Sequence, residues 1–208
     1  MMRCLLAALL LAASLSAAGA DVRTWDFRVL LDGREIGQHH FVLRDAGGER
    51  ELRSEARFDV RLLKVSVYRY VHEAVERWDG DCLTSLVSRT QTNGRRQAVN
   101  AAVRDGLLAV EGSKGRDEHG GCIMSFAYWN PRVLQARQLL NSQTGELLPV
   151  TITPRGEESI EVRGERRVAT RHHIAGRRLE VDLWYDGAAW LALEALTAGG
   201  QRLRYELM

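Results

Sequence analysis

The sequence predicts an all-β protein, in which an antiparallel meander of about ten strands closes into a barrel or curls into a half-barrel. Two observations carry this prediction. Apolar and polar residues alternate with a period of two along most of the chain, as in strands with one buried and one solvated face. Turn-forming pairs separate these runs at short intervals. A sheet of this length must curl, split or close to hide its apolar face and its edges.

The first twenty residues are predicted to be a secretory signal peptide. Arg3 provides a charged start, Leu5–Leu15 an apolar segment too short to span a membrane, and Ala18–Ala20 the small residues of a cleavage site. We therefore expect cleavage after Ala20 and a periplasmic or secreted protein, with residues 21–208 forming a single β-barrel-like domain. No cysteine stands at the cleavage site and no later segment is long and apolar, so neither a lipid anchor nor stable membrane insertion is expected.

The clearest alternation runs from Glu51 to Leu62. Its odd-numbered positions are all charged, whereas its even-numbered positions are apolar except for Ser54. This pattern argues against an outer-membrane barrel, because each Arg that faced lipid near the midplane would cost roughly 2–4 kcal/mol. The same alternation occurs in four further runs: Trp25, Phe27, Val29 and Leu31; Val65, Val67 and Val71; Leu179, Val181, Leu183 and Tyr185; and Leu203, Tyr205 and Leu207.

Turn-forming pairs, most of them containing Gly with Asp or Asn, punctuate these runs. Gly, Asn and Asp tolerate the positive φ angles that tight hairpins need. Two further segments, Gly112–Gly121 and Thr153–Glu158, are predicted to be loops. The predicted turns are Asp32-Gly33, Gly47-Gly48, Asp79-Gly80, Asn93-Gly94, Asp105-Gly106, Ala175-Gly176, Asp186-Gly187 and Gly199-Gly200.

One segment departs from the strand pattern and predicts a short α-helix from about Asn130 to Gln143. Val133, Ala136 and Leu140 recur at helical spacing. The Asn at its start can cap the N-terminus, and the Pro that follows suits the first helical position. We expect this helix to lie against the sheet or across one end of it.

Removal of the signal peptide leaves two cysteines, Cys82 and Cys122. An exported chain with two cysteines favours a disulfide between them, and two buried, unpaired thiols are the alternative. Neither cysteine belongs to a C-x-x-C pair, so a disulfide-exchange enzyme is not indicated.

The charges are balanced and interleaved, with 29 Lys and Arg against 27 Asp and Glu. Nucleic-acid binding typically needs basic residues gathered on one surface, so we expect no nucleic-acid partner. The sequence does not identify a protein partner.

No G-x-S-x-G elbow, phosphate-binding loop, dinucleotide fingerprint or C-x-x-C zinc pattern occurs. The segment His72–Glu76 begins like the zinc-protease H-E-x-x-H motif but ends in Glu, and a strand would place its ends too far apart to share one metal. Asp182 and Asp186 would lie about 13 Å apart on a strand, too far for a glycosidase pair. We therefore predict no catalytic residue, metal ligand or cofactor.

Two histidine pairs, His39-His40 and His172-His173, can each offer one ring to the interior, because adjacent residues on a strand point to opposite faces. If His40 joins Trp25 and Phe27 on the inner face through the hairpin at Asp32-Gly33, it could meet a second histidine in a metal or acid-base site. The alternative is one surface histidine and one that is satisfied by a hydrogen bond.

Aromatic and polar residues gather in two segments. Tyr68, Tyr70 and His72 share one face of a strand-like run, and Tyr128-Trp129 leads into the predicted helix cap. The disulfide would draw these segments together, and amphipathic rings near one end of a barrel can line a pocket for an apolar or amphipathic ligand. An ordinary filled core is the alternative. The predicted ligand-binding residues are Tyr68, Tyr70, His72, Tyr128, Trp129 and Asn130.

Six segments of the chain carry a resemblance to a known family: Tyr68–His72, Gly80–Leu83, Phe126–Pro131, Leu139–Asn141, Gln143–Gly145 and Asp182–Asp186. They resemble a family of exported bacterial proteins known as domain of unknown function 6134. The likeness covers nearly all of the chain after the signal peptide. It implies no activity, and it implies an architecture related to periplasmic barrels and half-barrels that shield lipids or isoprenoids, at the level of the fold alone.

The sequence therefore favours an exported, soluble β-barrel that holds a lipid-like small molecule or serves a cell-envelope complex. Two alternatives stay open. One is a periplasmic hydrolase or isomerase that acts inside the barrel with His72, Tyr128 and an acidic partner. The other is an interaction module with a filled core. A cavity would favour binding or catalysis, and a packed interior would favour the interaction module.

Overall fold

The computed structural model describes residues 20–62 and 65–208, and this part of the chain forms one antiparallel sheet of fourteen strands. The predicted signal peptide, apart from Ala20, lies outside the described residues. The strands are β1 (Asp21–Leu31), β2 (Arg34–Ala46), β3 (Glu49–Leu62), β4 (Val65–Asp79), β5 (Cys82–Thr92), β6 (Arg95–Arg104), β7 (Leu107–Gly112), β8 (Gly115–Gly120), β9 (Gln138–Leu140), β10 (Leu147–Val162), β11 (Glu165–Gly176), β12 (Leu179–Asp186), β13 (Ala189–Leu196) and β14 (Arg202–Leu207).

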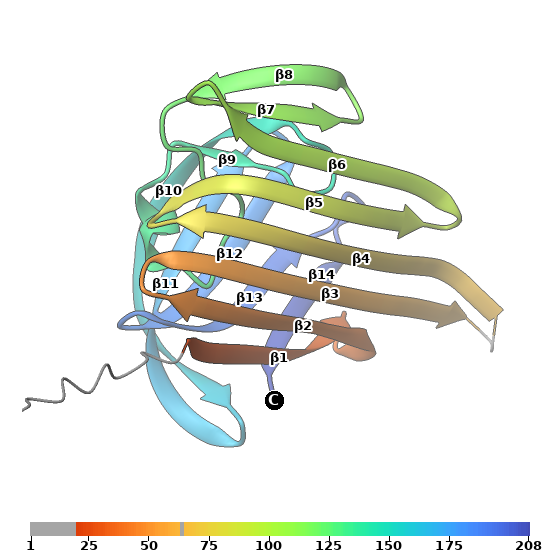
Figure 1. Cartoon of the computed structure of the whole chain (residues 1–208). Coiled ribbons are helices and arrows are strands. Elements are labelled where there is room, and N and C mark those ends of the chain that lie inside the picture. The colour runs from red at the N-terminus through yellow and green to blue at the C-terminus, as the bar shows by residue number, and fades with distance from the viewer. Residues whose placement is uncertain (1–19, 63–64) are drawn as a thin grey trace, which may run out of the picture.

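The sheet folds over on itself to make two walls (Figure 1). Strands β1–β8 form a front wall and β9–β14 a rear wall, and the walls are joined where β1 pairs with β14. Strands β8 and β9 are the two edges, so the sheet is curled but not closed. The prediction of a curled antiparallel meander is confirmed, although the strands number fourteen and not about ten.

The predicted α-helix at Asn130–Gln143 is wrong. This segment contains the 3-10 turn η1 (Pro131–Gln135) and then the short strand β9 (Gln138–Leu140). The amide of Leu140 donates to the carbonyl of Met124 at 2.8 Å, so it does not donate to a carbonyl one turn earlier. Hydrogen bonds to other segments therefore override the helical spacing of the apolar residues.

Some of the additional strands come from segments predicted to be loops. Gly112–Gly121 contains the whole of β8, and Thr153–Glu158 lies inside β10, where the pairing with β11 shifts between Pro154 and Gly156. Both predictions are wrong because Gly and charged residues do not always interrupt a strand. They instead occupy an exposed edge and a β-bulge, where such residues are tolerated.

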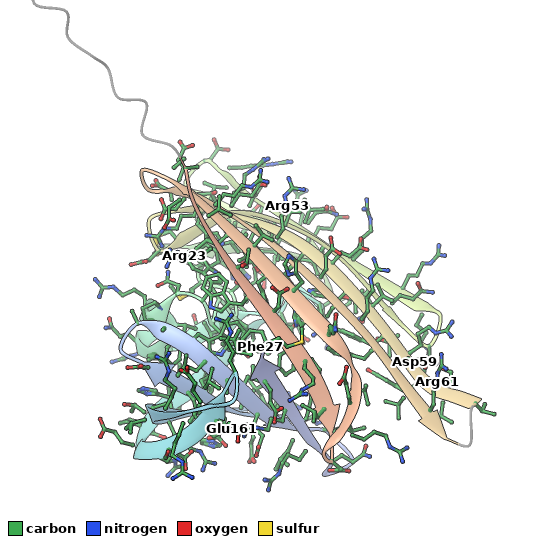
Figure 2. The ribbon with its side chains drawn as sticks, turned by 90° about the horizontal axis from the view of Figure 1, so that it is seen from below. Arg23, Phe27, Arg53, Asp59, Arg61 and Glu161 are labelled. Atoms are coloured by element: carbon green, nitrogen blue, oxygen red, sulfur yellow. A yellow bond between two sulfur atoms is a disulfide. The ribbon has the colours of Figure 1, made fainter. Side chains whose placement is uncertain are left out.

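The alternation predicted for β3 is confirmed, since Leu52 and Ala56 are buried while charged residues such as Arg53 point outward (Figure 2). In β4 the predicted face is wrong. Val65 and Val67 are among the most exposed apolar residues, and the inward positions alternate from Tyr70 to Trp78.

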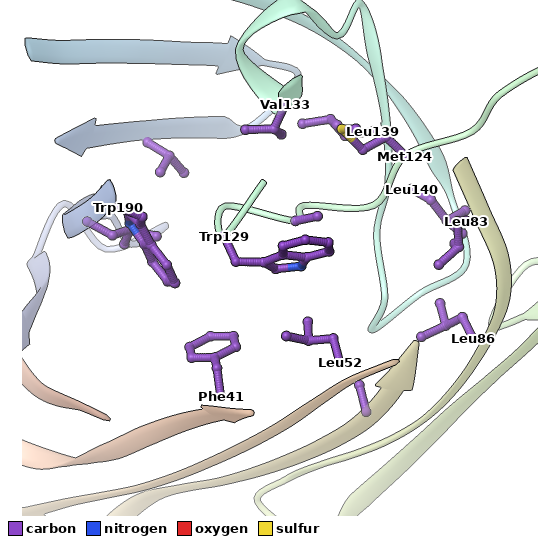
Figure 3. Packing of buried hydrophobic residues seen from close by; sticks show 14 of the residues in the cluster. Phe41, Leu52, Leu83, Leu86, Met124, Trp129, Val133, Leu139, Leu140 and Trp190 are labelled. Carbon is purple, nitrogen blue, oxygen red and sulfur yellow. The ribbon is translucent and has the colours of Figure 1, made fainter. Parts of the chain in front are cut away.

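The core lies between the walls and encloses the segment that connects them. This crossing segment, residues 121–146, runs from the end of β8 to the start of β10 and includes η1 and β9. Trp129, which belongs to this segment, lies at the centre of the core. Phe41 and Leu52 of the front wall lie on one side of it and Val133 on the other (Figure 3). The ring of Trp78 meets that of Trp129 edge to face, with centroids 5.5 Å apart.

The predicted disulfide between Cys82 and Cys122 is present in the structure. It joins the start of β5 to the crossing segment across 40 residues of sequence. Beside it, the amide of Leu83 donates to the carbonyl of Ile123 at 2.8 Å. The crosslink and this hydrogen bond together hold the crossing segment against the front wall.

A β-bulge in the first hairpin decides which histidine faces inward. With a two-residue turn at Asp32-Gly33, uninterrupted pairing would place His40 opposite Trp25. The register instead shifts by one residue near the turn, so His39 lies opposite Phe27 on the inner face. The inward placement of His40 is therefore wrong, and its ring lies on the outer face.

Gly37, which follows this bulge, approaches the backbone of β3 closely. A Cβ added there would lie 1.9 Å from the carbonyl oxygen of Arg57. We expect Gly37→Ala to lower the free energy of unfolding by about 1–3 kcal/mol, as overpacking typically does, when measured by urea denaturation. Gly120→Ala is the control, because its Cβ would contact only the Leu107 side chain, at 3.5 Å. Equal stability of Gly37→Ala and the wild type would contradict this close approach.

Candidate functional site

A chamber of about 270 Å³ lies between the two walls. Its lining comes from three parts of the fold: the inner face of β2–β4, the crossing segment, and the inner face of β12–β14. The twenty lining residues are His39, Phe41, Leu52, Ser54, Tyr70, His72, Ala74, Glu76, Phe126, Tyr128, Trp129, Asn141, Ser142, Gln143, Leu179, Val181, Leu193, Ala195, Leu203 and Tyr205.

The chamber exists because small side chains occupy the middle of the front wall's inner face. In one row across the sheet, Ala56 lies between His39 and His72. In the next row, Ser54 and Ala74 are direct neighbours on β3 and β4. Because protein interiors are otherwise close-packed, three small residues at adjacent inward positions leave a space that larger side chains would fill.

A wider hollow of about 660 Å³ forms a mouth to this chamber. The mouth lies between the β3–β4 hairpin and the turn at 197–201, and the two spaces share Tyr70, Gln143, Leu203 and Tyr205. Among the described residues, fourteen line the mouth and none of them is Asp, Glu, Lys, Arg or His. An uncharged entrance therefore leads to the chamber, and the volume of the mouth lies in the range of small-molecule pockets.

The middle of the chamber holds two histidines that are neutral near pH 7. The Nε2 atom of His39 lies 3.0 Å from the Ser54 hydroxyl, and its Nδ1 atom lies 3.3 Å from the Tyr205 hydroxyl. The Nδ1 atom of His72 lies 2.8 Å from the Thr90 hydroxyl. Burial lowers the pKa of His39 to about 3 and that of His72 to about 4. The reason is that a charged ring buried here would lose its hydration without gaining an anionic partner.

Glu76 lies deeper, in a row where its direct neighbours on β3 and β5 are Leu52 and Leu86. Its carboxyl group accepts a hydrogen bond from the Ser125 hydroxyl at 3.1 Å. Burial raises the pKa of Glu76 to about 7. It lies four residues from His72 on the same strand, about 13 Å away by strand rise, so the two groups do not form an acid-base pair.

The structure brings together five of the six residues predicted to bind a ligand. Asn130 lies at neither hollow; its side-chain amide donates to Asp81 at 2.9 Å and its oxygen caps η1 by accepting from the amide of Arg132. Trp129 serves the core as well as the chamber, since it is 3% exposed. The other four are Tyr70, His72 and Tyr128 at the chamber and Tyr68 at the mouth.

Sequence reasoning missed His39, Ser54, Glu76 and Tyr205 as site residues. Glu76 could have been found, because it is a carboxylate in phase with the inward positions of β4. Tyr205 lies on an inner face that the alternation predicts, but alternation alone does not distinguish a pocket-lining side chain from a core one. His39 could not have been found from alternation alone, since the bulge reverses which of the two histidines faces inward.

The described residues show no cluster of three His, Cys, Asp or Glu side chains that could hold a metal ion. Within the same ranges, no helix has the length and apolar character needed to cross a membrane.

Fold and site together define a curled, open antiparallel β-sheet protein with an internal chamber and an uncharged mouth. The chain belongs to the family described as "Domain of unknown function (DUF6134)", whose model matches residues 27–208. The family expected from the resemblance is thus confirmed. Comparison with curated proteins and with solved structures found no match.

Proposed function

We propose that this protein binds an apolar or amphipathic, lipid-like small molecule in the chamber and mouth. The observation that carries the proposal is an uncharged entrance continuous with an inner space. Charged residues make up 27% of the chain, so a lining of fourteen uncharged residues is unlike the rest of the surface. Small-molecule sites are typically concave, mostly apolar and equipped with a few polar groups that orient the ligand.

The chamber supports binding over the two alternatives. In a filled core, larger side chains would be expected at the adjacent inward positions that the small residues Ser54, Ala56 and Ala74 occupy. Among the described residues that line the chamber, Ser54 and His39 are a nucleophile and a base within hydrogen-bond distance, and catalysis would rest on this pair. A pKa of about 3 makes His39 a poor general base at neutral pH, and Tyr205 occupies the position where an acidic partner would orient the ring.

The cell envelope is the proposed place of action. The predicted signal peptide supports export to the periplasm or beyond. The disulfide supports it independently, because disulfides persist in oxidising compartments.

Filling the chamber tests the proposal. Ala74 is 6% exposed in the middle of the front wall, so Ala74→Phe places a ring in the chamber. We expect this variant to bind the uncharged fluorescent probe N-phenyl-1-naphthylamine at least tenfold more weakly than the wild type. Ala98→Phe, which adds the same ring on the exposed face of β6, should bind like the wild type.

The stability of the variants separates binding from folding. Ala74→Phe should unfold cooperatively in urea, and Ala195→Phe, which fills the chamber from the rear wall, provides a second test if the first variant does not fold. Absence of probe binding by the wild type would refute the proposal. Unchanged probe binding by a folded chamber-filling variant would show that the ligand does not bind in the chamber.

A further inference from the structure

The chamber contains polar atoms but very little charge. Among its twenty described lining residues, one is a carboxylic acid, Glu76, two are histidines, and none is Lys or Arg. An anionic head group in this space would have no cationic side chain to pair with among these residues. Burying an unpaired charge is far more costly than burying a polar group that forms a hydrogen bond.

A cationic head group is equally poorly accommodated at the level of the histidines. His39 and His72 lie in one row, separated by Ala56. The carboxyl group of Glu76 lies two rows deeper and already accepts a hydrogen bond from Ser125. Burial lowers the pKa of both histidine rings, as expected where no nearby anion offsets the loss of hydration.

The same space offers hydrogen bonds to a neutral group. The hydroxyls of Ser54 and Tyr205 flank the ring of His39, and a hydroxyl can both donate and accept. The Nδ1 atom of His72 is paired with Thr90, which leaves its Nε2 atom for a ligand. Gln143 lines both the chamber and the mouth, so its amide stands at the neck between them.

The mouth has the opposite character. Ile36, Phe58, Val60 and Val67 line it, together with residues of the turn at 197–201. An apolar chain gains free energy by leaving water for such a surface, in proportion to the area that is buried. The polar end of an amphipathic ligand thus fits the chamber, and its apolar end fits the mouth.

We infer that the chamber selects ligands with an uncharged, hydrogen-bonding head group, such as a hydroxyl or carbonyl, and rejects carboxylates and amines that carry the same apolar chain. This inference rests on the proposed function. It assigns His39, His72, Ser54 and Tyr205 to the head group and the uncharged mouth to the chain.

A panel of amphiphiles with equal chains tests the inference. 1-Dodecanol, dodecanoate and dodecylammonium are titrated at pH 6 into the purified protein with bound N-phenyl-1-naphthylamine, and displacement of the probe is measured. At pH 6 Glu76 is mainly protonated, because its pKa is about 7, so it does not attract the ammonium group. We expect dodecanol to displace the probe at a concentration at least tenfold lower than either charged compound. Equal displacement by all three, or stronger displacement by a charged one, overturns the inference while lipid-like binding stands. Failure of the probe itself to bind refutes the proposed function instead.

A matched pair of variants tests whether the selectivity for an uncharged head group arises in the chamber. Tyr70 lies at the junction of chamber and mouth and is partly exposed, so an Arg here can reach water. Tyr70→Arg should bind dodecanoate at least tenfold more tightly than Tyr70→Gln, whereas dodecanol should bind these two variants alike. Urea unfolding of both variants establishes that they fold. Equal dodecanoate binding by the two folded variants contradicts the location of the head group in the chamber.

Discussion

Replacing both Cys82 and Cys122 with Ala is expected to lower the free energy of unfolding by about 2–5 kcal/mol. The disulfide closes a loop across 40 residues of sequence, for which the chain-entropy estimate is roughly 4 kcal/mol. We expect the loss of the disulfide to affect the chamber as well, because the crosslink holds the crossing segment, which supplies Tyr128 and Trp129 to the chamber's lining.

Urea denaturation of the oxidised wild type and the double variant measures this effect. Reduced wild type should match the variant, and dithiothreitol should leave the variant unchanged. If the oxidised wild type and the variant unfold at the same urea concentration, the disulfide does not contribute to stability as we describe.

Glu76→Gln is expected to stabilise the protein increasingly as the pH rises, by about 2–3 kcal/mol more at pH 8 than at pH 5. Burial raises the pKa of Glu76 from 4.5 to about 7, so the folded protein retains a proton that the unfolded chain has released. Between these two pKa values, the free energy of unfolding of the wild type falls as the pH rises. The full cost of ionising the buried carboxyl group is reached above pH 7. Gln keeps the shape of the side chain and does not ionise.

Urea unfolding of both proteins at pH 5 and pH 8 gives the four free energies that are needed. His39 and His72 are present in both proteins, so their own pH dependence cancels in the comparison. Their lowered pKa values act in the opposite direction, because the unfolded chain binds protons below pH 6.5 that the folded protein does not. An advantage of Glu76→Gln that does not change with pH would show that Glu76 titrates normally.

Local sequence patterns predicted much of the fold, because the alternation of apolar and polar residues over a short run identifies the buried and the exposed face of a strand. Leu52, Ala56 and Phe58 are buried as their alternation indicated, and tight turns form at Asp32-Gly33 and Asn93-Gly94. The helix prediction failed because the apolar spacing that suggested it also fits a segment packed between two walls. There, the amide of Leu140 is committed to a carbonyl of another segment.

The chamber could not be derived from the sequence. Its space depends on Ser54, Ala56 and Ala74 lying in adjacent rows, and rows are set by the register of three strands. A shift of one residue exchanges the two faces of a strand, as the inward position of His39 demonstrates. The predicted cluster of Tyr70, His72 and Tyr128 nevertheless lies at this chamber, because Tyr70 and His72 fall at inward positions of β4 and Tyr128 belongs to the crossing segment.

Native mass spectrometry of the protein purified without detergent from the cells that make it tests the central claim most directly. We predict a population with the mass of the polypeptide plus one small apolar or amphipathic molecule that organic solvent extracts. Ala74→Phe, purified in the same way, should show the polypeptide mass alone, and Ala98→Phe should carry the ligand. Adducts that are equally abundant on Ala74→Phe, or their absence from the wild type together with no uptake of an apolar probe, would contradict a ligand-binding chamber.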